Sequence, residues 1–425
     1  MSTEFEIYRC PRCGKKYKVK SGLGRIKCSA CKDVYLLKKN LTFVHMADLH
    51  LGRNLCEMDL IDDQRYILRQ IVNIVKEKEA DGVIIAGDVY DKAVPSEAAT
   101  RLLSDFLDEL ARLKVKTFII SGNHDSDERL GYGSNLFESN KIFISAKYNG
   151  TLMKHTMNDG NGELDIWLLP FVKASQVKRF YPDEEINSYD DAVRVVIDKA
   201  GIDPERRNML IAHQFVTGRG SAPKMSGSES IATRSVGAVE LVGVDIFSAF
   251  DYVALGHIHS SQSVERYEVR YAGSPLKYSL SEVNSNKSVT LVTAGKKGSF
   301  KIETVPLRPL RDLRHIRGEM SVLLKKENIM SPNDYLYVTL TDEEVRPDAI
   351  GIFRQSYPYT VRLDYDNSHT KELEKNDVDI RIRNKTFDEL VTDFYSEIYG
   401  CEISDDEMKV MKDIAKEAGV INEAG

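Results

Sequence analysis

Metal-binding side chains follow immediately after five short apolar runs of this sequence. Each run is bounded by glycine or polar residues, a pattern typical of strands that are buried on both faces. The candidates are two aspartates, one asparagine and four histidines: Asp48, His50, Asp88, Asn123, His213, His257 and His259. Because open α/β folds collect functional residues at the ends of their strands, we expect these seven side chains to converge at one edge of a sheet.

The number and mix of these side chains suit a pair of divalent cations. Two neighbouring cations need about seven protein ligands and one carboxylate that bridges them. Oxygen and imidazole ligands together favour Mn(II), Fe or Zn(II) over Ca(II). Asp88 directly follows Gly87 on a sharp turn and is the natural bridge. Such a pair generates a hydroxide nucleophile and neutralises phosphoryl oxygens, so the predicted chemistry is phosphoester hydrolysis.

Two residues next to Asn123 complete the candidate site. His124 is better placed to act as an acid than as a ligand, either assisting the leaving oxygen or binding the phosphate. Asp125 is expected to orient His124. A single histidine at a strand end is more often a hydrogen-bonded structural residue, and we interpret four others in this way: His45, His155, His315 and His369.

The segments between these strand ends alternate between helical and strand patterns. Apolar residues recur at helical spacing over residues 63–80, and a second helix is expected to begin near Ser96. Lys116 opens the next strand, which gives the order of an α/β sheet with crossover helices. Shorter segments farther along the chain, such as 165–170 and 288–292, predict a second, partly antiparallel sheet.

Four of the six cysteines have the spacing of a closed metal site. They form two C-x2-C pairs that are fourteen residues apart: Cys10, Cys13, Cys28 and Cys31. Four thiolates on two tight turns predict a structural Zn(II) ribbon whose metal supplies the folding energy. Lysine, arginine and tyrosine residues surround these cysteines. Two interpretations stay open, a nucleic-acid contact and a small docking or stabilising module with a solvated basic surface.

Composition limits the class of protein. The chain has 425 residues and a formal charge of −6, which argues against a globally basic nucleic-acid coat. The charge is uneven, because residues 1–40 contain 11 Lys and Arg against 3 Asp and Glu, whereas residues 386–425 contain 3 against 11. We find no signal peptide and no run that could span a bilayer, and cysteines at metal-ligand spacing fit a reducing compartment. We therefore expect a cytoplasmic, nucleoid-associated protein.

The candidate ligands lie within motifs that resemble those of calcineurin-like metallophosphoesterases. Those motifs are Asp48-Leu-His50, Gly87-Asp88-Val-Tyr-Asp91, Gly122-Asn123-His124-Asp125, His213 and Gly256-His257-Ile-His259. Longer stretches resemble the SbcD family, the nuclease subunits of prokaryotic SbcC–SbcD complexes. They include Asp48-Leu-His-Leu-Gly-Arg53, His213-Gln-Phe-Val-Thr-Gly218 and Tyr271-Ala-Gly-Ser-Pro-Leu-Lys-Tyr278. The resemblance covers residues 41 to about 400.

The resemblance implies a fold, a metal arrangement and an activity. The fold is a four-layered αββα sandwich with a small α+β capping domain. One Mn(II) would bind Asp48, His50, Asp88 and His259, and the other would bind Asp88, Asn123, His213 and His257. His124 matches the catalytic histidine of the family. The activity is hydrolysis of DNA phosphodiester bonds, as an exonuclease on duplex ends and an endonuclease on hairpins or single strands, in DNA repair and recombination. The basic zinc ribbon departs from the common SbcD pattern.

The predicted domain organisation has four parts: a zinc ribbon at 1–40, a nuclease domain at 41–306, a capping domain at 307–385 and C-terminal helices at 386–425. The loop 216–230 is either a DNA contact or a tolerated surface loop. The candidate DNA contacts are Arg53, Arg219 and Lys224. The two acidic C-terminal helices either dock on a partner or pack back on their own domain. The resemblance implies that the partner is an SbcC-type coiled-coil ATPase, bound by a homodimer within a heterotetramer.

Two other functions compete with the nuclease. A phosphoesterase for nucleotides or phosphoproteins would use the same seven ligands. A scaffold that holds a partner on DNA without chemistry would not need His124 or the complete ligand set. The cap, the loop and the terminal helices favour the nuclease.

Overall fold

The computed structural model describes residues 5–10, 12–20, 25–32, 34–36, 39–218, 223–225, 241–368, 387–399 and 403–417. The chain divides into two compact units. The first comprises Met1–His315, Ser331–Tyr337 and Tyr357–Arg362, and the second comprises Ile316–Met330, Val338–Ser356 and Leu363–Gly425. The four-part organisation expected from the sequence is not tested by this division and stays a prediction.

Two six-stranded sheets form the centre of the first unit. In spatial order the first sheet contains β10 (Ile142–Ser145), β9 (Lys116–Ile120), β8 (Gly82–Ala86), β5 (Leu41–Met46), β19 (Ser288–Ala294) and β20 (Phe300–Pro306). The second contains β11 (Met153–Asp159), β12 (Gly162–Leu169), β13 (Arg207–His213), β16 (Tyr252–Gly256), β18 (Arg266–Tyr271) and β17 (Gln262–Val264). Four strands in each sheet run parallel, and antiparallel strands flank them.

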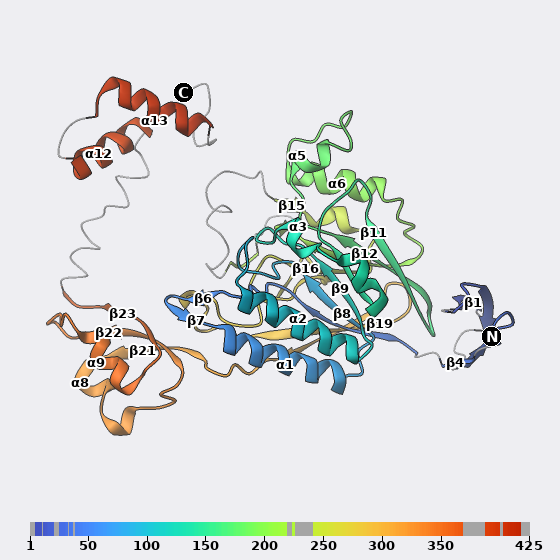
Figure 1. Ribbon diagram of the computed structural model, residues 1–425, viewed down its shortest axis with the longest axis horizontal. Coiled ribbons are helices and arrows are strands. Elements are labelled where there is room, and N and C mark those ends of the chain that lie inside the picture. Colours follow the sequence, from blue (N-terminus) through green and yellow to red (C-terminus); the bar gives the residue numbers. More distant parts are fainter. Residues whose placement is uncertain are drawn as a thin grey trace. The chain divides into compact units, whose positions relative to one another are not determined.

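Helices cover the outer faces of the two sheets (Figure 1). The helices and short elements of this region are α1 (Ile61–Glu77), α2 (Glu97–Arg112), α3 (Asp127–Leu130), α4 (Ser134–Phe137), η1 (Glu138–Asn140), α5 (Ala174–Lys178), α6 (Tyr189–Lys199), η3 (Val244–Phe247) and η4 (Leu280–Glu282). Short strand pairs are β6 (Asn54–Leu55) with β7 (Met58–Asp59), and β14 (Val216–Thr217) with β15 (Val242–Gly243). The result is the expected four-layered αββα sandwich.

Successive side chains of each strand point to opposite faces of its sheet, so each sheet contributes to two apolar cores. On β5, Val44 and Met46 join the core that α1 and α2 cover, whereas Phe43 lies in the core between the two sheets. On β13, Leu210 packs under α6 while Met209 faces the first sheet. Since both faces of these strands are buried, their sequences are continuously apolar. Each fully buried large side chain contributes about 1.5–3 kcal/mol of apolar burial.

The sequence analysis placed one strand in the wrong sheet. The segment 288–292 was expected in the second sheet, but β19 pairs antiparallel with β5 in the first. Its alternation predicts a strand correctly, but nothing local identifies the partner of a strand. By contrast, the segment 165–170 lies in β12 of the second sheet for most of its length.

Helices α1 and α2 follow the predicted periodicity. The hydroxyl of Ser96 accepts a hydrogen bond from the amide of Ala99, which caps α2 at the expected residue. The apolar stripes of both helices are buried against the first sheet. Burial within the chain therefore accounts for these stripes. Among the described helices, none combines the length and apolar character that crossing a bilayer would require.

The C-terminal part begins with a small three-stranded sheet. It consists of β21 (Leu313–Gly318), β22 (Tyr335–Leu340) and β23 (Thr360–Tyr365), with α8 (Met320–Leu323), η5 (Lys326–Asn328) and α9 (Ala349–Ser356) between the strands. This is the expected α+β cap. Two further helices follow, α12 (Phe387–Tyr399) and α13 (Asp405–Glu417). Ser404 and Glu407 form the predicted capping box at the start of α13.

The four cysteines at the N-terminus lie among two strand pairs. These are β1 (Phe5–Arg9) with β2 (Lys16–Lys20), and β3 (Arg25–Lys27) with β4 (Val34–Leu36). We call residues 5–36 the ribbon. Its few apolar residues cannot build a core of the size found in the sandwich, so the cysteine cluster must hold its two hairpins together.

Candidate metal centre

The seven predicted ligands come together, but at the edges of both sheets rather than of one. Strands β5, β8 and β9 lead into Asp48, His50, Asp88 and Asn123, while β13 and β16 deliver His213, His257 and His259. Parallel strands end on the same edge, and the stacking of the two sheets brings the two edges into contact. Six of the seven side chains are buried, and Asn123 is half-buried.

Three side chains form the first group of the centre. Nε2 of His50 and Nε2 of His259 lie 3.0 Å apart, and Asp48 offers a carboxylate oxygen beside them. The second group joins the Oδ1 atom of Asn123 to Nε2 of His213 at 3.2 Å and to Nδ1 of His257 at 3.0 Å. Each group thus presents several donor atoms to one point.

Asp88 lies between the two groups. Its Oδ2 atom is 3.6 Å from Nε2 of His50 and 3.4 Å from Nε2 of His213. The opposite nitrogen of His213, Nδ1, lies 2.7 Å from the carbonyl oxygen of Ala86, which keeps Nε2 turned towards Asp88. One carboxylate is therefore within reach of imidazoles from both sheets.

The unpaired atoms of this cluster fit cations. Among the described residues, Oδ2 of Asp48 is buried and makes no hydrogen bond, although such an atom normally finds a partner. Four candidate ligands also have left-handed backbone conformations, namely Asp48, His50, Asp88 and His257, whose φ angles are 54°, 42°, 49° and 102°. Non-glycine residues adopt these angles at a cost, and such strain clusters at functional sites. The donor set of carboxylate, amide and imidazole suits a transition metal.

Electrostatics in the metal-free protein favour metal-binding protonation states at His50, His257 and Asp88. His213 differs, because burial alone would lower its pKa, but Asp88 outweighs burial and raises that pKa to about 9. Burial lowers the pKa of His257 to about 3, and it lowers the pKa of His50 well below its usual value. Both rings are therefore neutral at pH 7. Burial alone would raise the pKa of Asp88, but His213 outweighs it and holds that pKa well below its usual value. Asp88 therefore stays ionised.

Two glycines allow the close approach of these side chains. A Cβ atom on Gly122 would lie 2.1 Å from Oδ1 of Asp88, and one on Gly87 would lie 2.2 Å from Nδ1 of His213. Gly87 also has a φ angle of 84°. The glycines of the GD and GN sequences thus leave room for the ligands of the neighbouring strands.

Beside the centre, the structure orients His124 through Asp91. Nδ1 of His124 lies 3.0 Å from the carbonyl oxygen of Asp91, and its backbone amide donates to Oδ1 of Asp88 at 2.9 Å. The orienting role predicted for Asp125 is wrong. The Asp125 carboxylate accepts three backbone amides, from Val89, Tyr90 and Gly122, and so fixes the loops that carry Asp88 and Asn123.

The sequence matches the models of two known protein families. A family model described as calcineurin-like phosphoesterase matches residues 41–261, about half of the chain. The chain belongs to the calcineurin-like phosphoesterase family. A second model, for the SbcD C-terminal domain, matches residues 309–399 and is described as the type 5 capsule protein repressor C-terminal domain. Together the two matches confirm the resemblance to SbcD.

Solved structures of similar chains include two distant ones. One is a dimetal phosphatase from Danio rerio, which is 11% identical with a TM-score of 0.36 and covers 63% of this chain and 99% of its own. The other is protein TT1561 of Thermus thermophilus, also 11% identical, with a TM-score of 0.35 and coverage of 62% and 99%. The family assignment of the phosphoesterase rests on the family model.

The three predicted DNA contacts of the phosphoesterase lie in different surroundings. The guanidinium of Arg53 lies beside the metal centre, where Nη1 pairs with Oδ1 of Asp91 at 3.1 Å and Cζ lies 5.5 Å from the centre of the Tyr278 ring. Lys224 is exposed, and Arg219 lies outside the described residues. Three arginines that follow the phosphoesterase strands, Arg311, Arg314 and Arg317, form ion pairs with Asp63, Asp334 and Asp366.

Three of the four remaining histidines have the structural roles expected of them. Nδ1 of His45 lies 2.9 Å from the Tyr252 hydroxyl between the sheets. His155 packs on Phe143, and His315 stacks on Tyr337. His369 lies outside the described residues.

A buried ion pair beside His259 was missed by the sequence analysis. Glu282 is 1% exposed, and its Oε1 atom lies 3.7 Å from Nδ1 of His259. Nζ of Lys287 pairs with Glu282 and donates to the His259 carbonyl at 3.0 Å. Burial alone would raise the pKa of Glu282, but His259 and Lys287 outweigh it and lower the pKa to about 2. The only sequence signal was its closeness to the motif that ends at Tyr278.

Gln64 of α1 was also missed. Its amide nitrogen donates to the carbonyl of His50 at 2.8 Å, and its oxygen accepts from the amide of Gly52 at 2.9 Å. These bonds hold the strained turn that carries His50. In the sequence Gln64 looks like any polar residue of an amphipathic helix.

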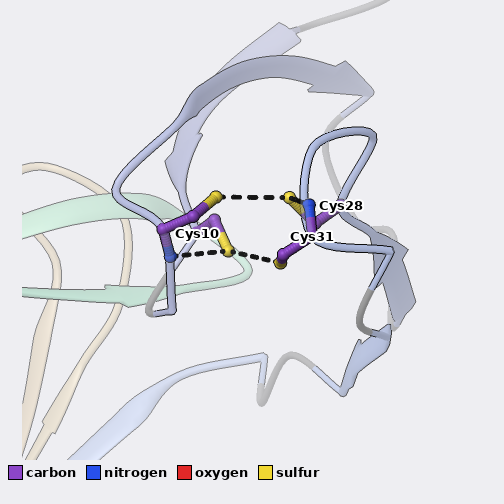
Figure 2. Close-up of side chains that lie close together, drawn as sticks. Cys10, Cys28 and Cys31 are labelled. Carbon is purple, nitrogen blue, oxygen red and sulfur yellow. Dashed lines mark hydrogen bonds between the residues drawn. The ribbon is translucent and has the colours of Figure 1, made fainter.

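The cysteine cluster of the ribbon is a second, separate metal-binding group. Figure 2 shows the side chains of Cys10, Cys28 and Cys31 gathered close together. The Sγ atoms of Cys10 and Cys31 lie 3.6 Å apart, and those of Cys13 and Cys28 lie 3.5 Å apart. Tetrahedral Zn(II) with bonds of about 2.3 Å separates its sulfur ligands by about 3.8 Å. The four thiols therefore fit a structural zinc, as predicted.

Proposed function

We propose that this phosphoesterase is a DNA nuclease subunit that hydrolyses phosphodiester bonds with two Mn(II) ions. The observation that carries the proposal is the position of Asp88, whose Oδ2 atom lies 3.6 Å and 3.4 Å from imidazole nitrogens of the two groups. A carboxylate shared in this way suits a dinuclear centre better than a single ion. The match of residues 309–399 to the SbcD C-terminal domain supports DNA as the substrate.

Each group would hold one ion, with Asp88 as the bridge. The first ion would take Asp48, His50, Asp88 and His259, whose donor atoms gather around the buried Oδ2 of Asp48. The second would take Asp88, Asn123, His213 and His257. When bound, two such cations supply the Lewis acidity that activates water and neutralises the phosphoryl oxygens.

His124 would act on the substrate rather than on the cations. Because Nδ1 faces the Asp91 carbonyl, it carries the ring proton there and leaves Nε2 for the substrate. In its protonated form Nε2 donates to a phosphoryl oxygen or to the leaving oxygen, as a general acid does. The His124 ring stands edge-on to His50, with ring centres 4.9 Å apart, so its position depends on the first group.

The substrate would be held by cations around this centre. Arg53 is closest to the chemistry, and its pairing with Asp91 also ties it to the residue that orients His124. Lys224, on the segment that follows His213, is exposed and would contact the DNA backbone together with Arg219. We propose exonuclease action on duplex ends and endonuclease action on hairpins or single strands, in DNA repair and recombination.

The C-terminal helices support a partner of the SbcC-type ATPase class. Val391 of α12 and Ala415 of α13 are buried, whereas Phe394 is 62% exposed and Val410 is 57% exposed. The Tyr395 hydroxyl donates to Glu407 at 2.7 Å, which links the two helices. A linked pair with exposed apolar side chains suits docking on a coiled coil. A homodimer within a heterotetramer remains part of this proposal.

Cleavage of an end-labelled DNA duplex with one hairpin end tests the proposal. The purified chain is incubated with Mn(II), beside an Asp88→Asn variant that keeps the size of the side chain. We expect shortening of the duplex and opening of the hairpin by the wild type, and no product from the variant. The same assay with an added SbcC-type ATPase measures how far the partner stimulates cleavage.

Two substrates separate the nuclease from its competitors. A nucleotide monoester and a phosphopeptide are offered to the same preparation with Mn(II). Hydrolysis of either one, with intact DNA in the presence and absence of the ATPase, would replace the nuclease by a nucleotide or protein phosphatase. Retention of DNA binding with no hydrolysis of any substrate would favour a scaffold.

A further inference from the structure

The ribbon cannot be a second catalytic centre. Cys10, Cys13, Cys28 and Cys31 use all four positions of a tetrahedral ion, which leaves none for a substrate. Whatever the ribbon recognises must therefore contact its surface. The surface is positively charged even after four thiolates and one Zn(II) are counted, because residues 1–40 hold 11 basic and 3 acidic side chains.

The rest of the chain has the opposite charge. The whole sequence contains 59 Lys and Arg against 65 Asp and Glu, so residues 41–425 hold 48 against 62. An acidic body repels a polyanion at long range, and this repulsion slows association. A basic module joined to that body offsets the repulsion where the module lies.

The β1–β2 hairpin separates the metal side of the ribbon from a cationic side. The Tyr17 hydroxyl contacts Sγ of Cys28 at 2.5 Å. The face of β2 that carries Tyr17 therefore lies over the cysteines. Side chains alternate along a strand, so Lys16 and Lys18 project from the other face, and both are exposed. Lys27, at the end of β3, is exposed as well. Lys15 lies on the same side as Tyr17, where its Nζ atom donates to the Ser29 hydroxyl at 3.2 Å.

The spacing of these lysines suits a chain of phosphates. Residues two apart on a strand are separated by about 6.8 Å, which is twice the axial spacing of phosphates, roughly 3.4 Å, along one DNA strand. Lys16 and Lys18 therefore reach different phosphates of one backbone. Lysines make point contacts to phosphate and carry little base specificity, so such a surface binds DNA without regard to sequence.

We propose that the ribbon binds the phosphate backbone of the DNA on which the metal centre acts, through Lys16, Lys18 and Lys27. This inference rests on the proposed function, because it takes DNA as the substrate. In this proposal the ribbon raises the affinity of the enzyme for DNA and leaves the rate of the chemical step unchanged.

Salt-dependent DNA binding by the full-length chain tests the inference. All proteins carry Asp88→Asn so that DNA stays intact, and affinity for a labelled duplex is measured from about 50 to 200 mM salt. The ribbon variant is Lys16→Gln, Lys18→Gln and Lys27→Gln. The control is Lys76→Gln, Lys78→Gln and Lys114→Gln, three exposed lysines of equal charge near the C-terminal ends of α1 and α2. Those helix ends precede β8 and β9, at the sheet edge where β5 also begins, so the control tests whether loss of any positive charge on the ribbon's side of the sandwich has the same effect.

We expect the ribbon variant to bind about tenfold more weakly at the lowest salt, with a salt slope that is shallower by about 2 to 3. The control should stay within about twofold of its parent, since it removes charge without removing contacts. One zinc per chain in the ribbon variant shows that the ribbon still folds. Equal losses in variant and control, or no loss in either, would overturn the inference.

A cleavage assay distinguishes failure of this inference from failure of the proposed function. With Asp88 intact and Mn(II) present, the ribbon variant should need more DNA for half-maximal cleavage but reach the same kcat. If the wild type cleaves DNA and the variant matches it at every DNA concentration, only the inference fails. If the wild type neither binds nor cleaves DNA, both fail. Loss of crosslinking between the ribbon and the acidic C-terminal helices in the variant, with DNA binding intact, would assign the ribbon to a protein contact instead.

Discussion

The metal centre and the ribbon both gather metal ligands, yet they are built in opposite ways. The centre lies on a scaffold of twelve strands whose cores exist without metal, and it holds Asp48, His50, Asp88 and His257 in strained backbone conformations. In the described part of the ribbon the structure has four short strands, and the sequence there offers few apolar side chains to bury. A large core can hold ligands in a geometry made for chemistry, whereas a small module uses its ligands to fold. We therefore expect the sandwich to fold without its metal ions and the ribbon to unfold when its zinc is removed.

Removing one zinc ligand should give the largest effect. Cys28→Ser opens the cysteine cluster, and structural zinc is worth about 10–16 kcal/mol to the folding of such modules. We expect hydrogen exchange of β1 to β4 to approach that of an unfolded chain, while β5 and β8 stay protected. If the ribbon of this variant stayed protected from hydrogen exchange, or if the sandwich lost its protection, the two regions would not differ in their dependence on metal.

Substituting His124 should separate chemistry from metal binding within the centre. His124→Asn removes the group that donates to the substrate but none of the seven ligands, so cleavage should fall about 10²- to 10⁴-fold. Bound Mn(II), measured by elemental analysis after gel filtration, should match the wild type. A variant that loses its metal together with activity would make His124 a ligand.

The strand ends that carry the centre could be predicted from the sequence, because each apolar run stops at a residue type that binds metal. Helices α1 and α2 were also predictable, and α2 begins at the expected cap, Ser96. What could not be predicted is pairing over long distances. No local pattern assigns β19 to the first sheet or shows that the ligands come from two sheets.

The roles of side chains around the ligands were the least predictable part of the site. Asp125 sits next to His124 in the sequence but bonds to three backbone amides, and Asp91 takes the orienting role. Glu282 is 23 residues from His259 and meets it only through the fold. Such contacts depend on the packing of several elements and leave no regular spacing in the sequence.

The Glu282 pair gives a way to sharpen the account of the scaffold. Glu282→Gln keeps the volume but removes the charge that faces Nδ1 of His259, and outer contacts of this kind change metal affinity by about 10- to 100-fold. We expect weaker Mn(II) binding by isothermal calorimetry, with kcat largely restored at saturating metal. Asp159→Asn is the matched control, because it breaks a buried pair with Arg207 away from the centre. Equal Mn(II) affinity in wild type and Glu282→Gln would limit the pair to a structural role.

The smallest effect should come from a surface-facing pair of the sandwich. Arg206 binds Asp165 through two hydrogen bonds of 2.7 and 2.9 Å. Burial alone would raise the pKa of Asp165, but Arg206 and Thr156 outweigh it and hold the pKa below its usual value. The pair therefore stabilises the fold above about pH 4, and this contribution is lost as the pH falls through the lowered pKa.

Asp165→Asn should lower the free energy of unfolding by about 2 kcal/mol at pH 7, a value reduced by the partial exposure of Arg206. The gap to the wild type should narrow near pH 3. Urea unfolding followed by the fluorescence of Trp167, the single tryptophan, measures both values in the same sheet. An equal gap at the two pH values would show that the charge of Asp165 is not the cause.

Electron paramagnetic resonance of the Mn(II)-loaded protein tests the central claim most directly. A dinuclear centre places its ions about 3.5–4 Å apart, close enough for their spins to couple. We predict two Mn(II) per chain and a spin-coupled signal in the wild type, and loss of the coupled signal in Asp88→Asn. A single uncoupled Mn(II) in the wild type, or a coupled pair that survives without the Asp88 carboxylate, would contradict the account.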